Sequence, residues 1–271
     1  TDMATNSPTF TLLNTRPTPM GEQLTSLCQR EGITCLSAPM IQTYPLSVTL
    51  PEAFQTELND PNIIWLFVSR TAVNAFAELL SQTGLKFQPA GPVIAVGPGS
   101  RTQLARQFSL PVDEIICPED ANSESLITLP QMNDASLKKA WLIKGEGGRA
   151  LIQTHLTTRN VPLEIINLYR RENIHYNERD IDTWQGVDMI LATSVDIASA
   201  LLQNAEAGAN PKTNTTAKNQ VAPGLTDKPW LVFSDRIKRY LVDQGVPDGR
   251  IFICEQTDNS SIISNIKRMA K

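Results

Sequence analysis

The sequence predicts an α/β protein built from parallel sheets. Short apolar runs alternate with amphipathic stretches of helical length along nearly the whole chain of 271 residues. Runs such as residues 63–68 are apolar on both faces, which is typical of parallel strands that helices cover on both sides. A weak internal duplication accompanies this alternation.

Each predicted strand is a short apolar run, and each predicted helix repeats its apolar residues along one face, as Leu24, Leu27 and Cys28 do. In the first half of the chain we expect strand 9–14, helix 21–30, strand 33–36, strand 63–68, helix 71–81, strand 93–96, helix 100–107, strand 114–117 and helix 123–129. In the second half we expect strand 140–144, helix 149–158, strand 163–169, strand 189–192, helix 195–203, strand 230–233, helix 236–244, strand 250–254 and helix 260–269.

One segment interrupts the alternation. Residues 208–228 are polar, contain several Pro, Gly and Asn residues, and have no sustained apolar period. Such a composition buries too little apolar surface to offset the entropy of ordering. We expect a mobile surface insertion, with a functional lid as the alternative.

The duplication consists of three pairs of similar segments. LLNTRPTPMGEQLTSLCQ (A) resembles WLIKGEGGRALIQTHLTT (A′), LFVSRTAVNAFAELL (B) resembles ILATSVDIASALLQ (B′), and VIAVGPGSRTQLARQF (C) resembles LVFSDRIKRYLVDQG (C′). The segments follow one another in the order A-B-C and then A′-B′-C′. Chance similarity between α/β units is the alternative explanation.

Composition excludes several classes of protein. The 24 basic and 28 acidic residues give a net charge of −4, so no global basic field attracts nucleic acid. The apolar runs are too short to span a membrane. Four cysteines without a C-x-x-C pair and two histidines predict no metal site, and the cysteines are expected to be buried, reduced thiols. Residues 1–8 are polar and lack a signal-peptide core, so we expect a cytoplasmic protein.

The predicted strand-to-helix turns are rich in Ser, Thr, Gly and Arg. They are NTRP, VSRTAV, VGPGS, KGEGGR, ATSVD and FSDR. Free N–H groups and helix N-termini at such turns suit carboxylate or phosphate, although ordinary capping would explain each turn by itself. Nucleotide-binding glycine motifs and the G-x-S-x-G motif are absent from the sequence, so a nucleotide cofactor and a serine hydrolase are both disfavoured.

Taken in order, the TRP, SRTAV, VGPGS, GEGGR, YRR and TS motifs resemble those of the uroporphyrinogen-III synthase family, from about residue 12 to residue 266. The resemblance implies two flavodoxin-like, doubly wound domains with a cleft between them. The first would comprise residues 1–39 and 176–271, the second residues 49–164, and residues 40–48 and 165–175 would be connector strands. The first domain would then take A with B′ and C′, and the second B and C with A′.

The resemblance also implies a reaction. Members of the family close the linear tetrapyrrole hydroxymethylbilane to uroporphyrinogen III, with loss of water and inversion of ring D through a spiro intermediate. No metal and no organic cofactor would be required, and the protein would act as a monomer in haem biosynthesis. Catalysis would be largely conformational, because the uncatalysed closure gives the uninverted isomer.

The residues that match the family motifs are expected to form its site. Tyr169, at the end of a predicted strand, matches a tyrosine proposed to assist departure of the hydroxyl group, whereas an ordinary strand-end tyrosine is the structural alternative. The expected substrate-binding residues are Arg16, Ser69, Ser100, Lys144, Gly145, Arg149, Ser194 and Ser234.

Four of these positions carry their own alternatives or departures. Lys144 stands where arginine is common, and lysine keeps the charge but not the bidentate fork. Arg16 and Arg149 could instead form buried salt bridges that fix turns. Near Ser234 the family often has a threonine where this chain has Ile237. For the whole protein, the alternative function is a non-catalytic, two-lobed α/β module that binds a small anion.

Overall fold

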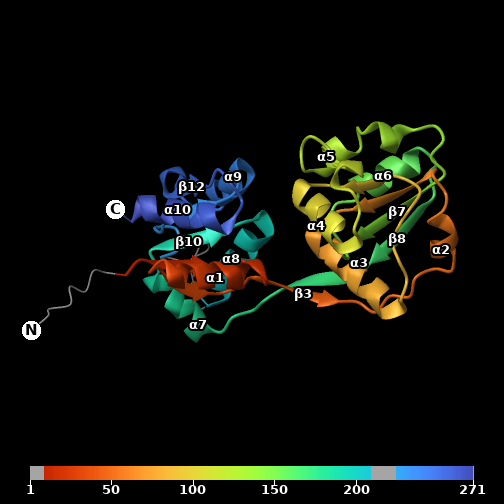
Figure 1. Ribbon diagram of the computed structural model, residues 1–271. Helices are drawn as coiled ribbons and strands as arrows, with labels where there is room; N and C mark the ends of the chain where they lie inside the picture. The colour runs from red at the N-terminus through yellow and green to blue at the C-terminus, as the bar shows by residue number, and fades with distance from the viewer. Residues whose placement is uncertain (1–8, 209–223, 271) are drawn as a thin grey trace, which may run out of the picture. The chain divides into compact units, whose positions relative to one another are not determined.

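The computed structural model describes residues 9–208 and 224–270, and the chain divides into two compact units. Unit 1 comprises Thr1–Gln42 with Glu172–Lys271, and unit 2 comprises Thr43–Arg171. Each unit is built around its own five-stranded parallel sheet (Figure 1). The predicted α/β class, with doubly wound parallel sheets, is confirmed.

The sheet of unit 1 has the strand order β12-β11-β10-β1-β2. Its strands are β1 (Thr11–Asn14), β2 (Thr34–Ser37), β10 (Met189–Ala192), β11 (Trp230–Val232) and β12 (Ile251–Ile253). In chain order within the unit this is 2-1-3-4-5, the order of flavodoxin-like sheets. The order changes direction between β1 and β10, which pair in parallel with Leu13 opposite Ile190.

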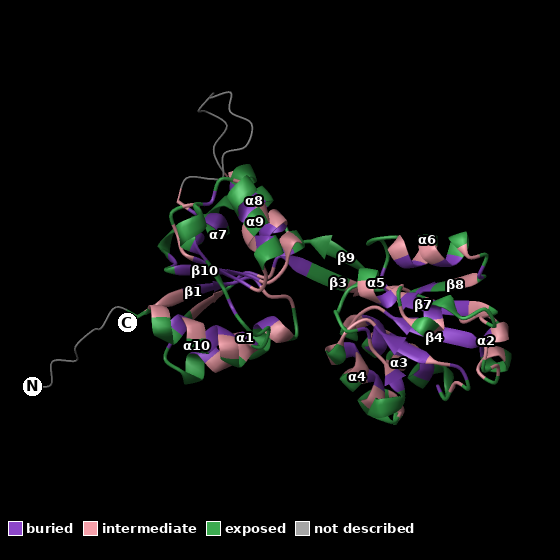
Figure 2. Cartoon of the chain, turned by 90° about the horizontal axis from the view of Figure 1, so that it is seen from above, coloured by how far each residue is buried: buried purple, intermediate pink, exposed green. Residues whose placement is uncertain are grey.

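Helices cover both faces of this sheet, because its strands are apolar on both faces. Figure 2 shows α1 (Met20–Arg30) and α10 (Asn259–Met269) on one side and α7 (Glu178–Thr183), α8 (Val195–Gly208) and α9 (Asp235–Asp243) on the other. Alternate strand residues follow these layers. Leu12 packs in the cluster of α1 and α10, and Leu13 packs in the cluster of α8 and α9. Two 3-10 turns, Trp184–Gly186 and Asp248–Arg250, complete the described elements of this unit.

The sheet of unit 2 has the order β6-β5-β4-β7-β8. Its strands are β4 (Ile63–Phe67), β5 (Val93–Ala95), β6 (Ile115–Ile116), β7 (Lys139–Lys144) and β8 (Leu163–Asn167). Helices α3 (Arg70–Thr83) and α4 (Pro98–Phe108) cover one face together with α2 (Ala53–Glu57). Helices α5 (Ser123–Leu126) and α6 (Leu151–Thr158) cover the other (Figure 2). The 3-10 turns are Val112–Glu114 and Pro130–Asn133.

The two sheets place the duplicated segments at equivalent positions. Segment A starts in β1 and leads into β2 of unit 1, and segment A′ starts in β7 and leads into β8 of unit 2. Segments B and B′ start in the central strands β4 and β10, and C and C′ start in β5 and β11 and lead on to the outer strands β6 and β12. Unit 2 is therefore a circular permutation of the unit 1 arrangement, with its own change of direction between β4 and β7.

Strands β3 (Ile41–Pro45) and β9 (Tyr169–Asn173) form a separate two-stranded sheet (Figure 2). The chain passes from unit 1 into unit 2 along β3 and returns along β9. The predicted strand 163–169 is wrong as one element, because residues up to Asn167 pair with β7 and Tyr169 begins a new strand. The expected start of the return connector at residue 165 was accordingly too early.

The ends of the predicted insertion also need correction. Gly208 is the last residue of α8, and Leu225 is fully buried and accepts a hydrogen bond of 3.0 Å from the Trp230 indole. The remainder of the predicted insertion, residues 209–223, lies outside the described residues. Helices α2 and α7 were not predicted, because they are too short to show a helical period.

Candidate functional site

In doubly wound sheets, ligands bind beyond the carboxyl ends of the strands where the strand order changes direction. In unit 1 these ends lead into Thr15 and Thr193, which follow β1 and β10. In unit 2 they lead into Val68 and Gly145, which follow β4 and β7. Most of the predicted site residues lie in these turns or at the start of the helices that follow.

Tyr169 and Ser69 form a hydrogen-bonded pair in unit 2. The Tyr169 side chain is buried, and its Oη lies 2.9 Å from Ser69 Oγ. Ser69 is the N-cap of α3 and accepts a hydrogen bond of 3.0 Å from the Ala72 N–H. Since Ser69 Oγ already accepts from the backbone, its own proton can be donated to Tyr169 Oη. The phenolic proton of Tyr169 is then available to a ligand.

Gly145 allows the ring of Tyr169 to approach the turn after β7. A Cβ atom at this position would lie 2.3 Å from Cε2 of Tyr169, which is far inside van der Waals contact. The backbone reinforces the contact, because the Glu146 N–H donates to the Tyr169 carbonyl oxygen at 2.7 Å. Glycine is therefore required here by close packing, and its predicted place in the site is beside Tyr169.

Lys144 places a cation at the same end of β7. Its Nζ donates to the carbonyl oxygen of Gly147 at 2.5 Å, and partial burial lowers the pKa of the amino group from its usual value. Gly147 and Gly148 have positive φ angles of 71° and 80°, a conformation that glycine adopts without strain. The GEGGR turn thus curls back over the lysine.

Arg149 and Ser100 lie in less suitable surroundings for a ligand. Arg149 forms an ion pair with Glu124, and both side chains are more than half exposed, so the alternative of a buried salt bridge is wrong for this residue. Ser100 lies in the first turn of α4 and is 6% exposed, which leaves little of its hydroxyl group accessible.

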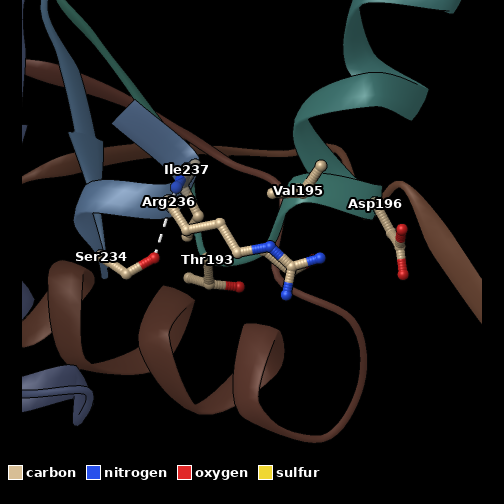
Figure 3. Close-up of a pocket in the computed structure, with 7 residues that line it drawn as sticks. Thr193, Val195, Asp196, Ser234, Arg236 and Ile237 are labelled. Carbon is tan, nitrogen blue, oxygen red and sulfur yellow. Dashed lines mark hydrogen bonds between the residues drawn. The ribbon is translucent and has the colours of Figure 1, made fainter. Parts of the chain in front are cut away.

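In unit 1, Ser194 and Ser234 line one pocket of about 260 Å³ (Figure 3). Each hydroxyl group caps a helix: Ser194 Oγ accepts from the Ile197 N–H at 3.1 Å, and Ser234 Oγ accepts from the Ile237 N–H at 3.3 Å. The N-termini of α8 and α9 therefore meet at one pocket. The presence of Ile237, where the family often has a threonine, is explained by its burial: this side chain is 4% exposed and belongs to the core.

Arg236, Thr193 and Asp196 complete the polar lining of this pocket, and none of them was among the predicted site residues. Figure 3 shows the Arg236 side chain extending across the pocket toward Thr193 and Asp196. The sequence signal was the FSDR turn, in which an arginine follows a capping serine by two positions. A guanidinium group beside two helix N-termini makes this pocket suitable for an anion.

Arg16 serves to hold turns of unit 1 together. Its Nη1 donates to Asn259 Oδ1 at 2.6 Å, and its Nη2 donates to the Thr257 carbonyl oxygen at 3.3 Å. The guanidinium group also lies 5.1 Å from the centre of the Phe233 ring. These contacts, with two carbonyl-type oxygens and an aromatic ring, favour the turn-fixing alternative for Arg16 over the expected contact with substrate.

Within residues 9–208 and 224–270, no group of three or more His, Cys, Asp or Glu side chains is arranged to hold a metal ion. No helix in the same ranges has the length and apolar character needed to cross a membrane.

Known proteins resemble this chain both in sequence and in fold. The family model for uroporphyrinogen-III synthase HemD matches residues 22–251. Uroporphyrinogen-III synthase of Escherichia coli K12 is 30% identical over 197 residues, which cover 71% of this chain and 78% of that protein. The enzyme of Proteus mirabilis is 29% identical over 170 residues, covering 62% of this chain and 83% of the relative.

Solved structures extend the comparison to the fold. A mutant uroporphyrinogen III synthase of Thermus thermophilus has a TM-score of 0.60 at 16% identity, covering 96% of this chain and 98% of that one. The synthetase of Helicobacter pylori 26695 has a TM-score of 0.56 at 12% identity, covering 96% and 99%. With the family match over most of its length, the chain belongs to the uroporphyrinogen-III synthase family.

Proposed function

We propose that this protein converts hydroxymethylbilane into uroporphyrinogen III, as a lyase of tetrapyrrole and haem biosynthesis. The observation that carries the proposal is the family match over residues 22–251, which includes most of the turns described above. The reaction expels one water and rearranges carbon–carbon bonds without net oxidation or reduction. Catalysis of this reaction therefore requires proton transfer and control of the substrate conformation.

The first step is departure of the hydroxyl group from the hydroxymethyl carbon of ring A. Tyr169 would donate its phenolic proton to this group, which leaves as water, and loss of the ring A pyrrole N–H proton then gives the neutral azafulvene. The pair with Ser69 supports this role, since a proton donated by Ser69 Oγ leaves the Tyr169 proton free for the substrate. The same bond would stabilise negative charge on Tyr169 Oη after the transfer.

The second requirement is to hold the bilane so that the substituted carbon of ring D attacks the azafulvene. The resulting spiro intermediate fragments and closes again to give the inverted ring. The substrate carries acetate and propionate groups, and we infer that Ser194, Ser234 and Arg236 bind some of them in unit 1. In unit 2, Lys144 and the turns at Ser69, Ser100, Gly145 and Arg149 are the proposed contacts, with Arg16 supporting its turn in unit 1.

These local groups explain how a protein with a net charge of −4 can accept an anionic substrate. Helix N-termini and single cations act over a few ångströms, whereas net charge acts mainly on long-range approach. The proposed enzyme would work in the cytoplasm. It would work as a monomer, since each unit encloses its own apolar clusters. Analytical ultracentrifugation at micromolar protein concentration would test whether the protein is monomeric.

The decisive experiment is incubation of the protein with freshly prepared hydroxymethylbilane, followed by chromatographic separation of the type I and type III isomers after oxidation. The expected result is type III product that increases with protein concentration. Type I product at the same rate with and without protein would overturn the proposal. Heat-inactivated protein provides the blank for uncatalysed closure.

A further inference from the structure

A pair of cysteines lies between α1 and β2 in unit 1. Cys28 is on α1 and fully buried, whereas Cys35 is on β2 and partly exposed. Both belong to the same apolar cluster, and the Ile33 N–H donates to the Cys28 carbonyl oxygen at 2.9 Å, which brings the start of β2 against the end of the helix. The two side chains are also hydrogen-bonded to each other, and both thiols are free.

Cys35 borders an open pocket of about 470 Å³. The pocket is lined by Thr25, Gln29, Gly32, Ile33, Thr34 and Cys35. A small polar solute can reach the Cys35 sulfur from this pocket. Cys28, at 0% exposure, does not line this pocket and is closed to solvent. The arrangement gives one accessible thiol and one protected thiol.

Hydrogen-bond donors surround the Cys35 sulfur. The Asn14 Nδ2 donates to Thr25 Oγ1 at 3.1 Å, so the Thr25 proton is free to be donated to Cys35 Sγ at 3.5 Å. The Cys28 thiol, and then Thr25 and Asn14, lower the pKa of Cys35 to about 7 against the opposing effect of burial. The same contact with Cys35, together with burial, raises the pKa of Cys28.

We propose that Cys28 and Cys35 form a peroxide-sensitive dithiol, in which Cys35 reacts first and Cys28 resolves the product into an intramolecular disulfide. The Cys35 thiolate attacks one oxygen of hydrogen peroxide, the O–O bond breaks, and the departing hydroxide takes a proton to become water. The Cys28 sulfur then attacks the Cys35 sulfenic acid, loses its proton and displaces hydroxide, which leaves as a second water. Two thiols are oxidised and one peroxide is reduced.

The test treats the full-length protein with a stoichiometric amount of hydrogen peroxide, blocks the remaining thiols and digests it with trypsin. Cleavage after Arg30 separates the two cysteines, so a disulfide joins two peptides that reduction releases. The expected product is one Cys28–Cys35 crosslink per chain. In Cys28→Ala, a dimedone adduct should accumulate on Cys35, and in Cys35→Ala neither product should form at these two positions.

Cys117 provides the matched control within the wild-type protein. It is also partly exposed, but burial raises its pKa, so it should react more slowly than Cys35 at pH 7. Faster labelling of Cys117, or disulfides formed mainly between molecules, would overturn the proposal. The readout is thiol chemistry alone, so it is independent of the proposed synthase activity.

The Thr25 hydroxyl group offers a second and gentler test. Thr25→Val keeps the shape of the side chain but removes the donor to Cys35, whereas Thr25→Ser keeps the donor. The pH at which the rate of iodoacetamide labelling of Cys35 is half-maximal should rise in Thr25→Val and return toward the wild-type value in Thr25→Ser. Equal midpoints in all three proteins would show that the donors do not activate this thiol.

Discussion

At the scale of single residues, the Tyr169 hydroxyl group is the part of the proposed mechanism that one substitution can remove. Tyr169→Phe should lower turnover by roughly 10²-fold, the usual contribution of a positioned proton donor. It should cost about 1 kcal/mol of stability through the lost bond to Ser69. Initial rates of type III product formation and thermal unfolding measure the two effects.

Tyr176→Phe is the matched control for this change. The Tyr176 hydroxyl group donates to the Pro39 carbonyl oxygen at 2.7 Å, so its removal also deletes a partly buried hydrogen bond. Turnover should stay near the wild-type value in the control. If the two variants lose activity equally, Tyr169 has a structural role and the proton must come from another group.

Gly145 supplies the second residue-scale prediction. In Gly145→Ala the new methyl group would meet the Tyr169 ring, and we expect a loss of roughly 1–3 kcal/mol of stability together with reduced turnover. Gly186→Ala is the control, because nothing lies within 4 Å of a Cβ at that position. Chemical denaturation of both variants would measure the difference, and equal stabilities would contradict the packing argument.

At the scale of elements, the pocket between the N-termini of α8 and α9 depends on Arg236. Arg236→Ala should raise KM for the bilane about tenfold with little change in kcat, because the side chain is proposed to bind a carboxylate and not the reacting carbon. Arg239→Ala on the same helix is the control. Arg239 pairs with Asp235 on the exposed side of α9, and such pairs contribute little. A similar KM for both variants would remove the pocket from the substrate site.

The sequence predicted those elements whose patterns are long or strongly apolar. Strand β10 was predicted with the same bounds that the structure shows, whereas the predicted helix 195–203 in fact continues to Gly208. Short helices such as α2 carry no measurable period, and the break at Leu168 is a matter of backbone pairing that composition does not encode. Element type was therefore predictable where burial dictates it, and boundaries were not.

The candidate site shows the same division. Capping residues such as Ser69 and Ser234 were found because a serine before a helix has a recognisable sequence pattern. Contacts between distant positions, such as Arg16 with Asn259, depend on the tertiary structure and leave no local signal. Arg236 lay in a turn already singled out, yet only the geometry of the pocket distinguishes it from other exposed arginines.

At the scale of the whole molecule, the two units differ in how the chain builds them. Unit 2 is one continuous segment, Thr43–Arg171, and unit 1 is made of two segments. The two sheets nevertheless have equivalent strand orders and therefore equivalent folds. In unit 2 the strands β7 and β8 come last in the chain, whereas their counterparts in unit 1, β1 and β2, come first. Continuity of the chain, and not the strand arrangement, distinguishes the two units.

This difference predicts that residues 43–171 fold when expressed alone. Both faces of the unit 2 sheet carry their own buried cluster, one with Trp65 and Trp141 and the other with Leu66 and Leu142. The fragment should unfold in one cooperative thermal transition, reported by the fluorescence of the two buried tryptophans. It should form no type III product, because the pocket with Ser194, Ser234 and Arg236 belongs to unit 1. A non-cooperative transition would mean that unit 2 depends on unit 1 for its stability, and type III product from the fragment would mean that the unit 1 pocket is dispensable for the reaction.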